Sequence, residues 1–183
     1  VLADAVNTLA LNGTVETVTG GTLADSVTLS GTVSGATYNL GAGADRLTLA
    51  NGANTLTASD IESIVGGTGV DDITLSTAIS GLAIDLGGSN GDKLTLADGG
   101  NTLLASNVET IVGNSGADIV TLGAVVSDGN FNLGAGADQL ILQNGSNNLT
   151  STGIETITGG TGADTVTLGT AQTSGTFSLG AGI

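Results

Sequence analysis

The chain has no cysteine, histidine, proline, methionine or tryptophan, and its only aromatic residues are Tyr38, Phe131 and Phe177. Without cysteine it can form neither a disulfide framework nor a zinc–thiolate site, and without histidine it lacks the other common zinc ligand. A conventional globular core would use larger side chains than the alanine, valine, leucine and isoleucine that dominate here. No apolar run approaches membrane-spanning length, so we expect no membrane insertion.

Positive charge is also scarce. Arg46 and Lys93 are the only basic residues against 17 acidic ones, and the formal net charge is −15. Because phosphate binding depends on lysine and arginine, we expect no nucleic acid partner. Regularly placed β-branched residues distinguish the chain from acidic disordered sequences. The 32 glycines each cost backbone entropy to order, so something other than a thick core must stabilise the fold.

What the sequence does contain is a repeat. A Val/Ile–Glu–Thr/Ser triplet recurs at nearly constant intervals, and no linker interrupts the pattern. Residues 1–183 therefore form one repetitive segment of four units of about 46 residues. Val1 matches Thr48 in phase and Ile183 matches Ala137, so we expect a piece of a longer array. The glutamates of the triplet are Glu16, Glu62, Glu109 and Glu155.

Each unit contains a glycine-rich phrase that ends in aspartate and leads into a strand-like triplet such as Val-Thr-Leu. Shorter and longer spacings between these aspartates alternate, as from Asp25 to Asp45 and from Asp45 to Asp71. We interpret each interval as one rung of an all-β, parallel β-solenoid resembling a β-roll or β-helix. The solenoid would have about eight rungs, flat or three-sided, with alternating lengths of about 20 and about 26 residues. The motif aspartates are Asp25, Asp45, Asp71, Asp92, Asp118, Asp138 and Asp164.

Side-chain alternation supports strands between the motifs. Seven residues before most motif aspartates stands a large apolar residue, and the next position is mostly polar. This period of two predicts one face turned inward and one outward. The inward series is Val18, Tyr38, Ile64, Ile84, Ile111, Phe131, Ile157 and Phe177. The outward column is predicted to contain Thr28, Thr48, Thr74, Thr95, Thr121 and Thr167.

Stacked rungs would bring the seven aspartates into a single column. Neighbouring carboxylates about 4.8 Å apart repel by roughly 3.5 kcal/mol at an effective dielectric constant of 20. Since Arg46 and Lys93 supply only two counter-charges, we expect bound cations between the rungs. Ca²⁺ accepts carboxylate and carbonyl oxygens in flexible geometry, whereas Mg²⁺ demands a tight octahedron. Glycine lets the turn direct successive carbonyl groups to one point.

The phrases GGTGVDDIT (66–74), GGTGADTVT (159–167) and GNSGADIVT (113–121) resemble the RTX, or hemolysin-type, calcium-binding nonapeptide. The resemblance implies a parallel β-roll with Ca²⁺ in the turns. Seven aspartates in one column define six gaps between rungs, so we expect about six ions. The chain departs from the family because 11 to 17 other residues separate successive motifs, and because Leu23 and Asn90 replace the third glycine. Besides the seven aspartates, the expected site residues are Gly41, Gly43, Gly66, Gly67, Gly69, Gly113, Gly116, Gly134, Gly136, Gly159, Gly160 and Gly162.

The resemblance also implies a bacterial, secreted protein of the cell surface, S-layer or extracellular matrix. We expect a structural element that stacks head to tail into fibres or lattices, with cell-surface glycans as a further contact. Because no cluster of residues breaks the repeat, we expect no enzyme. The alternative is an ice-binding or adhesive solenoid. The four glutamates are either second calcium ligands or solvated corner residues that hydrogen-bond to a turn.

Overall fold

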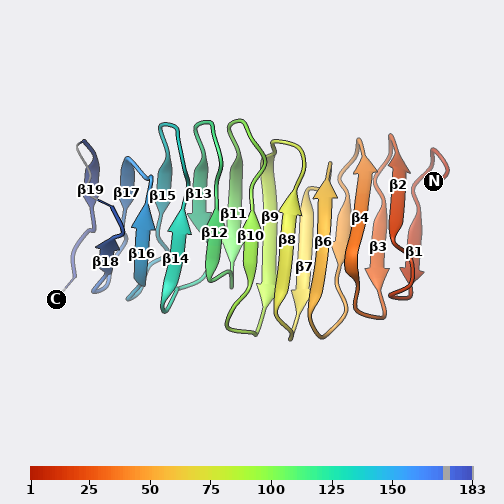
Figure 1. Cartoon of the computed structure of the whole chain (residues 1–183), viewed down its shortest axis with the longest axis horizontal. Coiled ribbons are helices and arrows are strands. Elements are labelled where there is room, and N and C mark those ends of the chain that lie inside the picture. The colour runs from red at the N-terminus through yellow and green to blue at the C-terminus, as the bar shows by residue number, and fades with distance from the viewer. Residues whose placement is uncertain (171–173, 183) are drawn as a thin grey trace.

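The computed structural model describes residues 1–170 and 174–182, which form two parallel β-sheets lying face to face (Figure 1). The chain passes from one sheet to the other after every strand. We call the ten-stranded sheet of odd-numbered strands sheet A, and the nine-stranded sheet of even-numbered strands sheet B. The rungs are therefore flat and two-sided, and the expected parallel β-solenoid is confirmed.

All strands are short, and each sheet follows chain order from one end of the molecule to the other. Sheet A consists of β1 (Thr8–Leu11), β3 (Ser26–Leu29), β5 (Arg46–Thr48), β7 (Ser63–Gly67), β9 (Ser80–Gly87), β11 (Thr102–Ser106), β13 (Ile119–Leu122), β15 (Gln139–Ile141), β17 (Thr156–Thr158) and β19 (Thr176–Ser178). Sheet B consists of β2 (Thr17–Gly21), β4 (Ser34–Gly41), β6 (Asn54–Ser59), β8 (Asp71–Leu75), β10 (Lys93–Thr95), β12 (Thr110–Val112), β14 (Gly129–Asn132), β16 (Asn148–Thr152) and β18 (Thr165–Leu168).

The predicted rung length of about 26 residues was wrong. In sheet A, Leu47 of β5 pairs with Ile64 of β7, and Ile64 pairs in turn with Ile84 of β9. The step from Leu47 to Ile64 is a rung of 17 residues. At the corner, the hydrogen bond from the Asp45 backbone N–H to Glu62 Oε2 spans the same 17 residues. The interval from Asp45 to Asp71 therefore contains one such rung, which ends at Glu62, and the nine residues that carry the chain to the opposite edge.

Successive sequence repeats lie on opposite sides of the solenoid. Two rungs advance the chain from Leu47 to Ile84. A repeat of about 46 residues is longer than this step and covers about two and a half rungs. The extra half rung moves each repeat from one sheet to the other, so equivalent residues of neighbouring repeats face opposite directions.

The core is a single layer of aliphatic side chains between the sheets, as the alternation predicts. In β3, Val27 and Leu29 are buried and Thr28 between them is exposed. The predicted inward series is at most 4% exposed from Val18 to Ile157, although its members are divided between the two sheets. Phe177 differs, at 39% exposed, because it lies in β19 at the end of sheet A. The described residues form no helix, and hence none long and apolar enough to cross a membrane.

The outward threonines do not form the one column that the sequence predicts. Thr28, Thr48 and Thr121 lie in sheet A, whereas Thr74, Thr95 and Thr167 lie in sheet B. Sheet B has a different and longer column, in which five successive strands, β2 to β10, place threonine at paired positions. These residues are Thr17, Thr37, Thr57, Thr74 and Thr95.

Candidate functional site: the corner ladders

The motif aspartates lie at the corners where the chain enters a new sheet, but at two edges rather than one. Those that precede strands of sheet A are Asp25, Asp45, Asp118 and Asp138, and those that begin or precede strands of sheet B are Asp71, Asp92 and Asp164. The prediction of one column of seven aspartates was wrong. Each edge instead carries short stacks of two motif aspartates, since the half-rung offset moves every repeat to the opposite edge.

A four-residue hydrogen-bonded ladder surrounds each pair. In the second repeat, Asp71 Oδ1 accepts hydrogen bonds from the Asn54 backbone N–H at 3.0 Å and side-chain Nδ2 at 2.8 Å. Asp92 Oδ1 accepts the backbone N–H of Asp71 at 2.7 Å. Glu109 Oε2 then accepts the backbone N–H of Asp92 at 3.0 Å. Each side chain therefore bonds to the backbone of the preceding rung at the same corner.

The same order of asparagine, two aspartates and glutamate recurs along the solenoid. The other complete ladders, with equivalent bonds of 2.6 to 2.9 Å, are Asn7–Asp25–Asp45–Glu62 and Asn101–Asp118–Asp138–Glu155. A further ladder begins with Asn147 and Asp164. Leu23 and Asn90, which depart from the glycine motif, leave Asp25 and Asp92 in the same ladder positions as the other motif aspartates.

Within residues 1–170 and 174–182, every motif aspartate has one carboxylate oxygen without a hydrogen-bond partner. Six of the seven are at most 2% exposed, Asp164 being the less buried one. In all seven, Oδ2 is buried and has no hydrogen-bond partner among the described residues. An ionised carboxylate in this position carries a large desolvation cost unless a positive charge or a proton reaches the free oxygen.

The pKa values reflect this burial. Desolvation raises the pKa of Asp45 and of Asp71 above the ordinary value, against the opposing effect of the ladder hydrogen bonds. Desolvation also raises the pKa of Asp92 and of Asp138 to about 6, and the neighbouring Asp and Glu of each ladder add to the effect. The corners therefore favour binding of a proton or of a cation.

Neither basic residue neutralises a ladder in the part of the chain that the structure describes. Lys93 Nζ lies 3.4 Å from Asp72 Oδ2 on the outer face of sheet B. Arg46 Nε donates to Thr48 Oγ1 at 3.3 Å. Both residues directly follow a motif aspartate in sequence, but the strand alternation turns their side chains outward while the aspartates stay buried.

The corner glycines permit close stacking of the rungs. Gly87 has φ of +93°, and a Cβ there would collide with the carbonyl oxygen of Gly67 in the rung before. The glycines expected as site residues share this arrangement: an added Cβ would press against backbone or polar side-chain atoms of a neighbouring corner. They are Gly41, Gly43, Gly66, Gly67, Gly69, Gly113, Gly116, Gly134, Gly136, Gly159, Gly160 and Gly162. Stacking alone therefore accounts for glycine at these positions.

Each corner offers a cation few acidic ligands. No group of three or more acidic side chains comes together in the described residues in a way that could hold a metal ion. An ion at a corner would take the free Oδ2 of one or two aspartates, and backbone carbonyl oxygens would complete the shell. Ca²⁺ accepts such a set, since carbonyl groups are among its usual ligands.

The ladder also contains residues that the motif search did not include. Asn54, Asn101 and Asn147 are almost fully buried and begin the ladders, where each Nδ2 also donates to two carbonyl oxygens of its own turn. A sequence signal for them exists, because each stands at the same separation before a motif aspartate. Glu62, Glu109 and Glu155 end ladders, so the expectation of a hydrogen bond to a turn is confirmed for these three.

The fold and its corners together define a class: a flat, two-sheet parallel β-solenoid whose rungs are connected by buried Asn–Asp–Asp–Glu ladders at both edges. Comparison of the chain with protein-family models, with curated proteins and with solved structures finds no match.

Proposed function

We propose that the chain is a calcium-stabilised structural segment of a secreted bacterial surface, S-layer or extracellular filament protein, without catalytic activity. The observation that carries the proposal is the set of seven buried aspartate oxygens that lack a partner among the described residues. In a chain of net charge −15 these oxygens need a positive charge, and both basic side chains lie elsewhere. Ca²⁺ supplies that charge with little demand on ligand geometry.

The ligands would come from the motif corners. Asp71 and Asp92 would contribute their free oxygens, and the backbone of residues 66–70 and 86–91 would contribute carbonyl groups. Equivalent sites would lie at Asp25 with Asp45, at Asp118 with Asp138, and at Asp164. The glutamate that ends each ladder is already bonded to a backbone N–H, so it would stay outside the site.

An extracellular location fits the calcium requirement. Modules outside the cell bind calcium with dissociation constants of about 10⁻⁴ to 10⁻³ M, so a site with one or two carboxylates suffices there. The resemblance of the motifs to hemolysin-type repeats supports the same location and a bacterial source.

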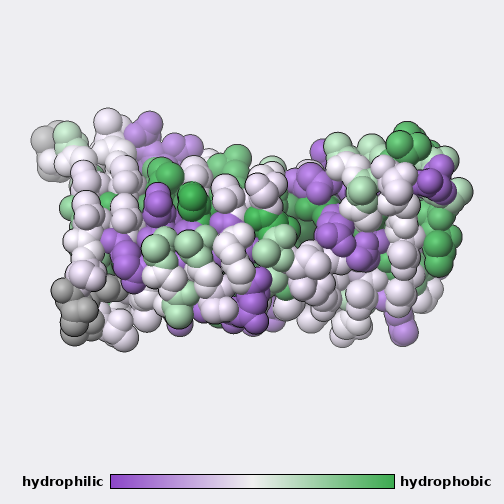
Figure 2. Space-filling model, turned by 90° about the horizontal axis from the view of Figure 1, so that it is seen from above, coloured by the Kyte–Doolittle hydropathy of each residue, from purple (hydrophilic) through white to green (hydrophobic). Residues whose placement is uncertain are grey.

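Head-to-tail association belongs to this proposal. Association would take place through the sheet edges of the stacked rungs, where a second copy would continue both sheets. Val166, Leu168, Phe177 and Leu179 form an apolar hollow at one end. At the other end Val1 and Val6 are exposed, and Figure 2 shows hydrophobic residues gathered where the N-terminus lies. Stacking would extend both sheets and bury these side chains.

Circular dichroism tests the calcium requirement. We expect exhaustive chelation to lower the thermal unfolding midpoint strongly or to remove the β-sheet spectrum, and added Ca²⁺ to restore it, because ion binding and folding are linked. Direct metal analysis should find several ions per chain. A protein of unchanged spectrum and unchanged unfolding midpoint after chelation would exclude calcium as the stabilising agent.

Ice binding is the second candidate, and a specific observation favours it. The outer face of sheet B carries the five-threonine column from Thr17 to Thr95. Strand spacing repeats these threonines about every 4.8 Å along the sheet. Freezing-point hysteresis of the protein would test it: Thr74→Lys on sheet B should abolish hysteresis, and Thr28→Lys on sheet A should preserve it. Absence of hysteresis in the unmodified protein would eliminate this candidate.

A further inference from the structure

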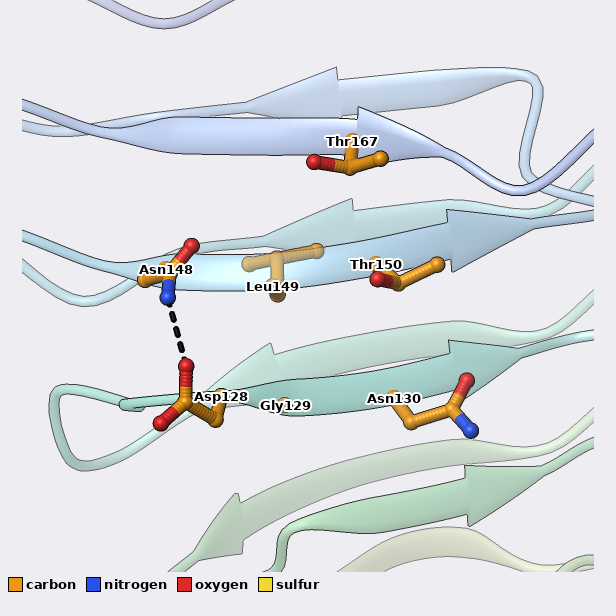
Figure 3. Close-up of a pocket in the computed structure, with 7 residues that line it drawn as sticks. All are labelled: Asp128, Gly129, Asn130, Asn148, Leu149, Thr150 and Thr167. Atoms are coloured by element: carbon orange, nitrogen blue, oxygen red, sulfur yellow. Dashed lines mark hydrogen bonds between the residues drawn. The ribbon is translucent and has the colours of Figure 1, made fainter.

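One hollow on the outer face of sheet B is lined by polar side chains from three neighbouring strands (Figure 3). Its volume is about 250 Å³. Asp128 directly precedes β14, and Asn130 lies in that strand. Asn148 and Thr150 come from β16, and Thr167 comes from β18. The five side chains offer a carboxylate, two primary amides and two hydroxyl groups.

The repeat provides an internal comparison. The preceding repeat forms a hollow of about 400 Å³ at equivalent positions on sheet A, lined by Gly81, Ala83, Thr102, Leu104 and Thr121, with Leu82 and Leu103. Its lining is mainly apolar. The backbone therefore forms a hollow over three neighbouring strands in both repeats, and the side chains determine the chemistry of each hollow.

Three departures from the repeat meet in the sheet B hollow. Asp128 stands where the first two repeats have glycine, Asn130 where they have threonine and alanine, and Asn148 where the other three repeats have threonine. The equivalent residues are Gly35 and Gly81, Thr37 and Ala83, and Thr8, Thr55 and Thr102. Each departure introduces a carboxylate or an amide, and all three side chains line the same 250 Å³ space.

Asp128 occupies this place at a conformational cost. Its φ is +64°, and its counterparts Gly35 and Gly81 have φ of +74° and +90°. The left-handed conformation is less favourable for a residue with a side chain than for glycine. Asn148 Nδ2 donates to Asp128 Oδ1 at 2.7 Å across the hollow, which fixes the carboxylate and leaves its second oxygen available.

We propose that this hollow binds a neutral carbohydrate. A sugar hydroxyl both donates and accepts, so neighbouring hydroxyls match a carboxylate that only accepts and amides that do both. Asp128 and the net charge of −15 disfavour anionic ligands, and the polar lining disfavours apolar ones. The side chains of the hollow lie on the outer face of sheet B, whereas the ladder side chains are buried at the corner, although Asn148 directly follows the ladder residue Asn147. The hollow is therefore a separate site from the proposed calcium sites and locates the expected contact with glycans.

NMR titration of the full chain with glucose, galactose and mannose tests the proposal. We expect at least one hexose to give saturable shifts of the Thr150 and Thr167 backbone amide signals. The variant Asp128→Gly/Asn130→Thr/Asn148→Thr restores the residues of the first repeat and should lose this response. Its thermal unfolding midpoint should be unchanged or higher, because the left-handed aspartate is replaced by glycine.

Three results would overturn the proposal. One is no response of the unmodified protein to any of the three hexoses, and another is an equal response of the triple variant. The third is the same shifts from Ca²⁺ without sugar, which would identify the hollow as a cation site. If the triple variant retains sugar binding and has a lower unfolding midpoint, the Asp128–Asn148 hydrogen bond stabilises the turn and does not serve sugar binding.

Discussion

At the scale of single residues, Asp71 shows the physical conflict that each corner contains. Its Oδ1 accepts two hydrogen bonds from Asn54, each of the charge-assisted kind worth about 1.5–3 kcal/mol. Its Oδ2 is buried without a partner among the described residues. The carboxylate therefore stabilises the stack through one oxygen and destabilises it through the other, and a cation changes only the second contribution.

Replacing Asp71 by asparagine separates these contributions. Asp71→Asn can keep the Oδ1 hydrogen bonds and removes the buried charge. Without calcium we expect an unfolding midpoint equal to or above that of the unmodified protein, and with calcium a smaller gain in midpoint and fewer bound ions. Asp128→Gly, at an exposed residue outside the ladders, serves as the control and should keep the full calcium response. Calorimetry with and without chelator measures both, and an unaltered calcium response of Asp71→Asn would contradict the assignment.

The pKa values predict an unusual dependence of stability on pH. Asp92 and Asp138 have a pKa of about 6 in the folded chain against 3.8 for the free side chain. Between these values the folded state binds more protons, so its stability rises as pH falls. We expect the calcium-free unfolding midpoint to increase from about pH 7 to about pH 4, and the calcium-bound midpoint to decrease because protons compete with the ion. The double variant Asp92→Asn/Asp138→Asn should flatten both profiles.

At the scale of elements, the corner is a stacked turn whose backbone approaches the next rung too closely for most side chains. Gly87 and Gly88 illustrate how local this constraint is. Gly87 has a positive φ and lies against the Gly67 carbonyl, whereas an added Cβ on Gly88 meets no atom within 4 Å. The two neighbouring glycines thus have different physical roles although the motif contains both.

Alanine substitution distinguishes them. Gly87→Ala should destabilise the fold by at least about 1–2 kcal/mol, because it adds left-handed strain to a backbone clash. Gly88→Ala should be neutral or slightly stabilising, since alanine reduces the entropy of the unfolded chain. Chemical denaturation of the two variants gives the comparison. Equal destabilisation by both would show that the stacked-turn geometry is wrong.

The glutamates that end ladders offer a second matched pair. Glu109 Oε2 accepts the backbone N–H groups of Gly91 and Asp92, each at 3.0 Å, whereas the side chain of Glu16 makes no such bond in the described residues. Both stand in the same Val-Glu-Thr triplet. Glu109→Ala should cost about 1–3 kcal/mol because it leaves the Asp92 N–H unsatisfied at a buried corner, and Glu16→Ala should cost little. Urea denaturation would measure the difference, and a larger loss for Glu16→Ala would contradict the ladder.

At the scale of the whole molecule, the half-rung offset distributes the buried charge over both edges. Neighbouring ladders alternate between the edges that lead into sheet A and sheet B, so neither edge carries all seven aspartates. The repulsion between ladders is therefore smaller than in one continuous column. The net charge of −15 still keeps separate molecules apart until cations reduce it.

Calcium should therefore promote linear association. Several bound ions would bring the net charge close to zero and allow the apolar end rungs to stack, by a contact that does not close into a ring. We expect light scattering to rise across a calcium titration and electron microscopy to show fibres or lattices. Phe177→Asp, at the exposed end of sheet A, should reduce association without removing calcium binding. A strictly monomeric protein at saturating calcium would leave a spacer that does not assemble.

Much of this fold could be derived from the sequence alone. Local periodicity predicts the repeat, the strand after each aspartate and the inward series through Val18, Tyr38 and Ile64. It does so because each rung of a parallel solenoid is a short, contiguous piece of the sequence. The glycine-rich turn and the aspartate that ends it are also local in origin. These features required no knowledge of which rung lies beside which.

Rung pairing and face assignment were decided by the tertiary structure. Half of the ladder positions hold asparagine or glutamate, so the glycine–aspartate motif by itself marks only half of the corners and not those at Asn54 and Glu62. As a result, the 17-residue rung from Asp45 to Glu62 and the half rung after it appear in the sequence as one long interval between Asp45 and Asp71. Only the stacking of neighbouring rungs shows that the repeat changes sides, and hence that Asp128, Asn130 and Asn148 meet on one face.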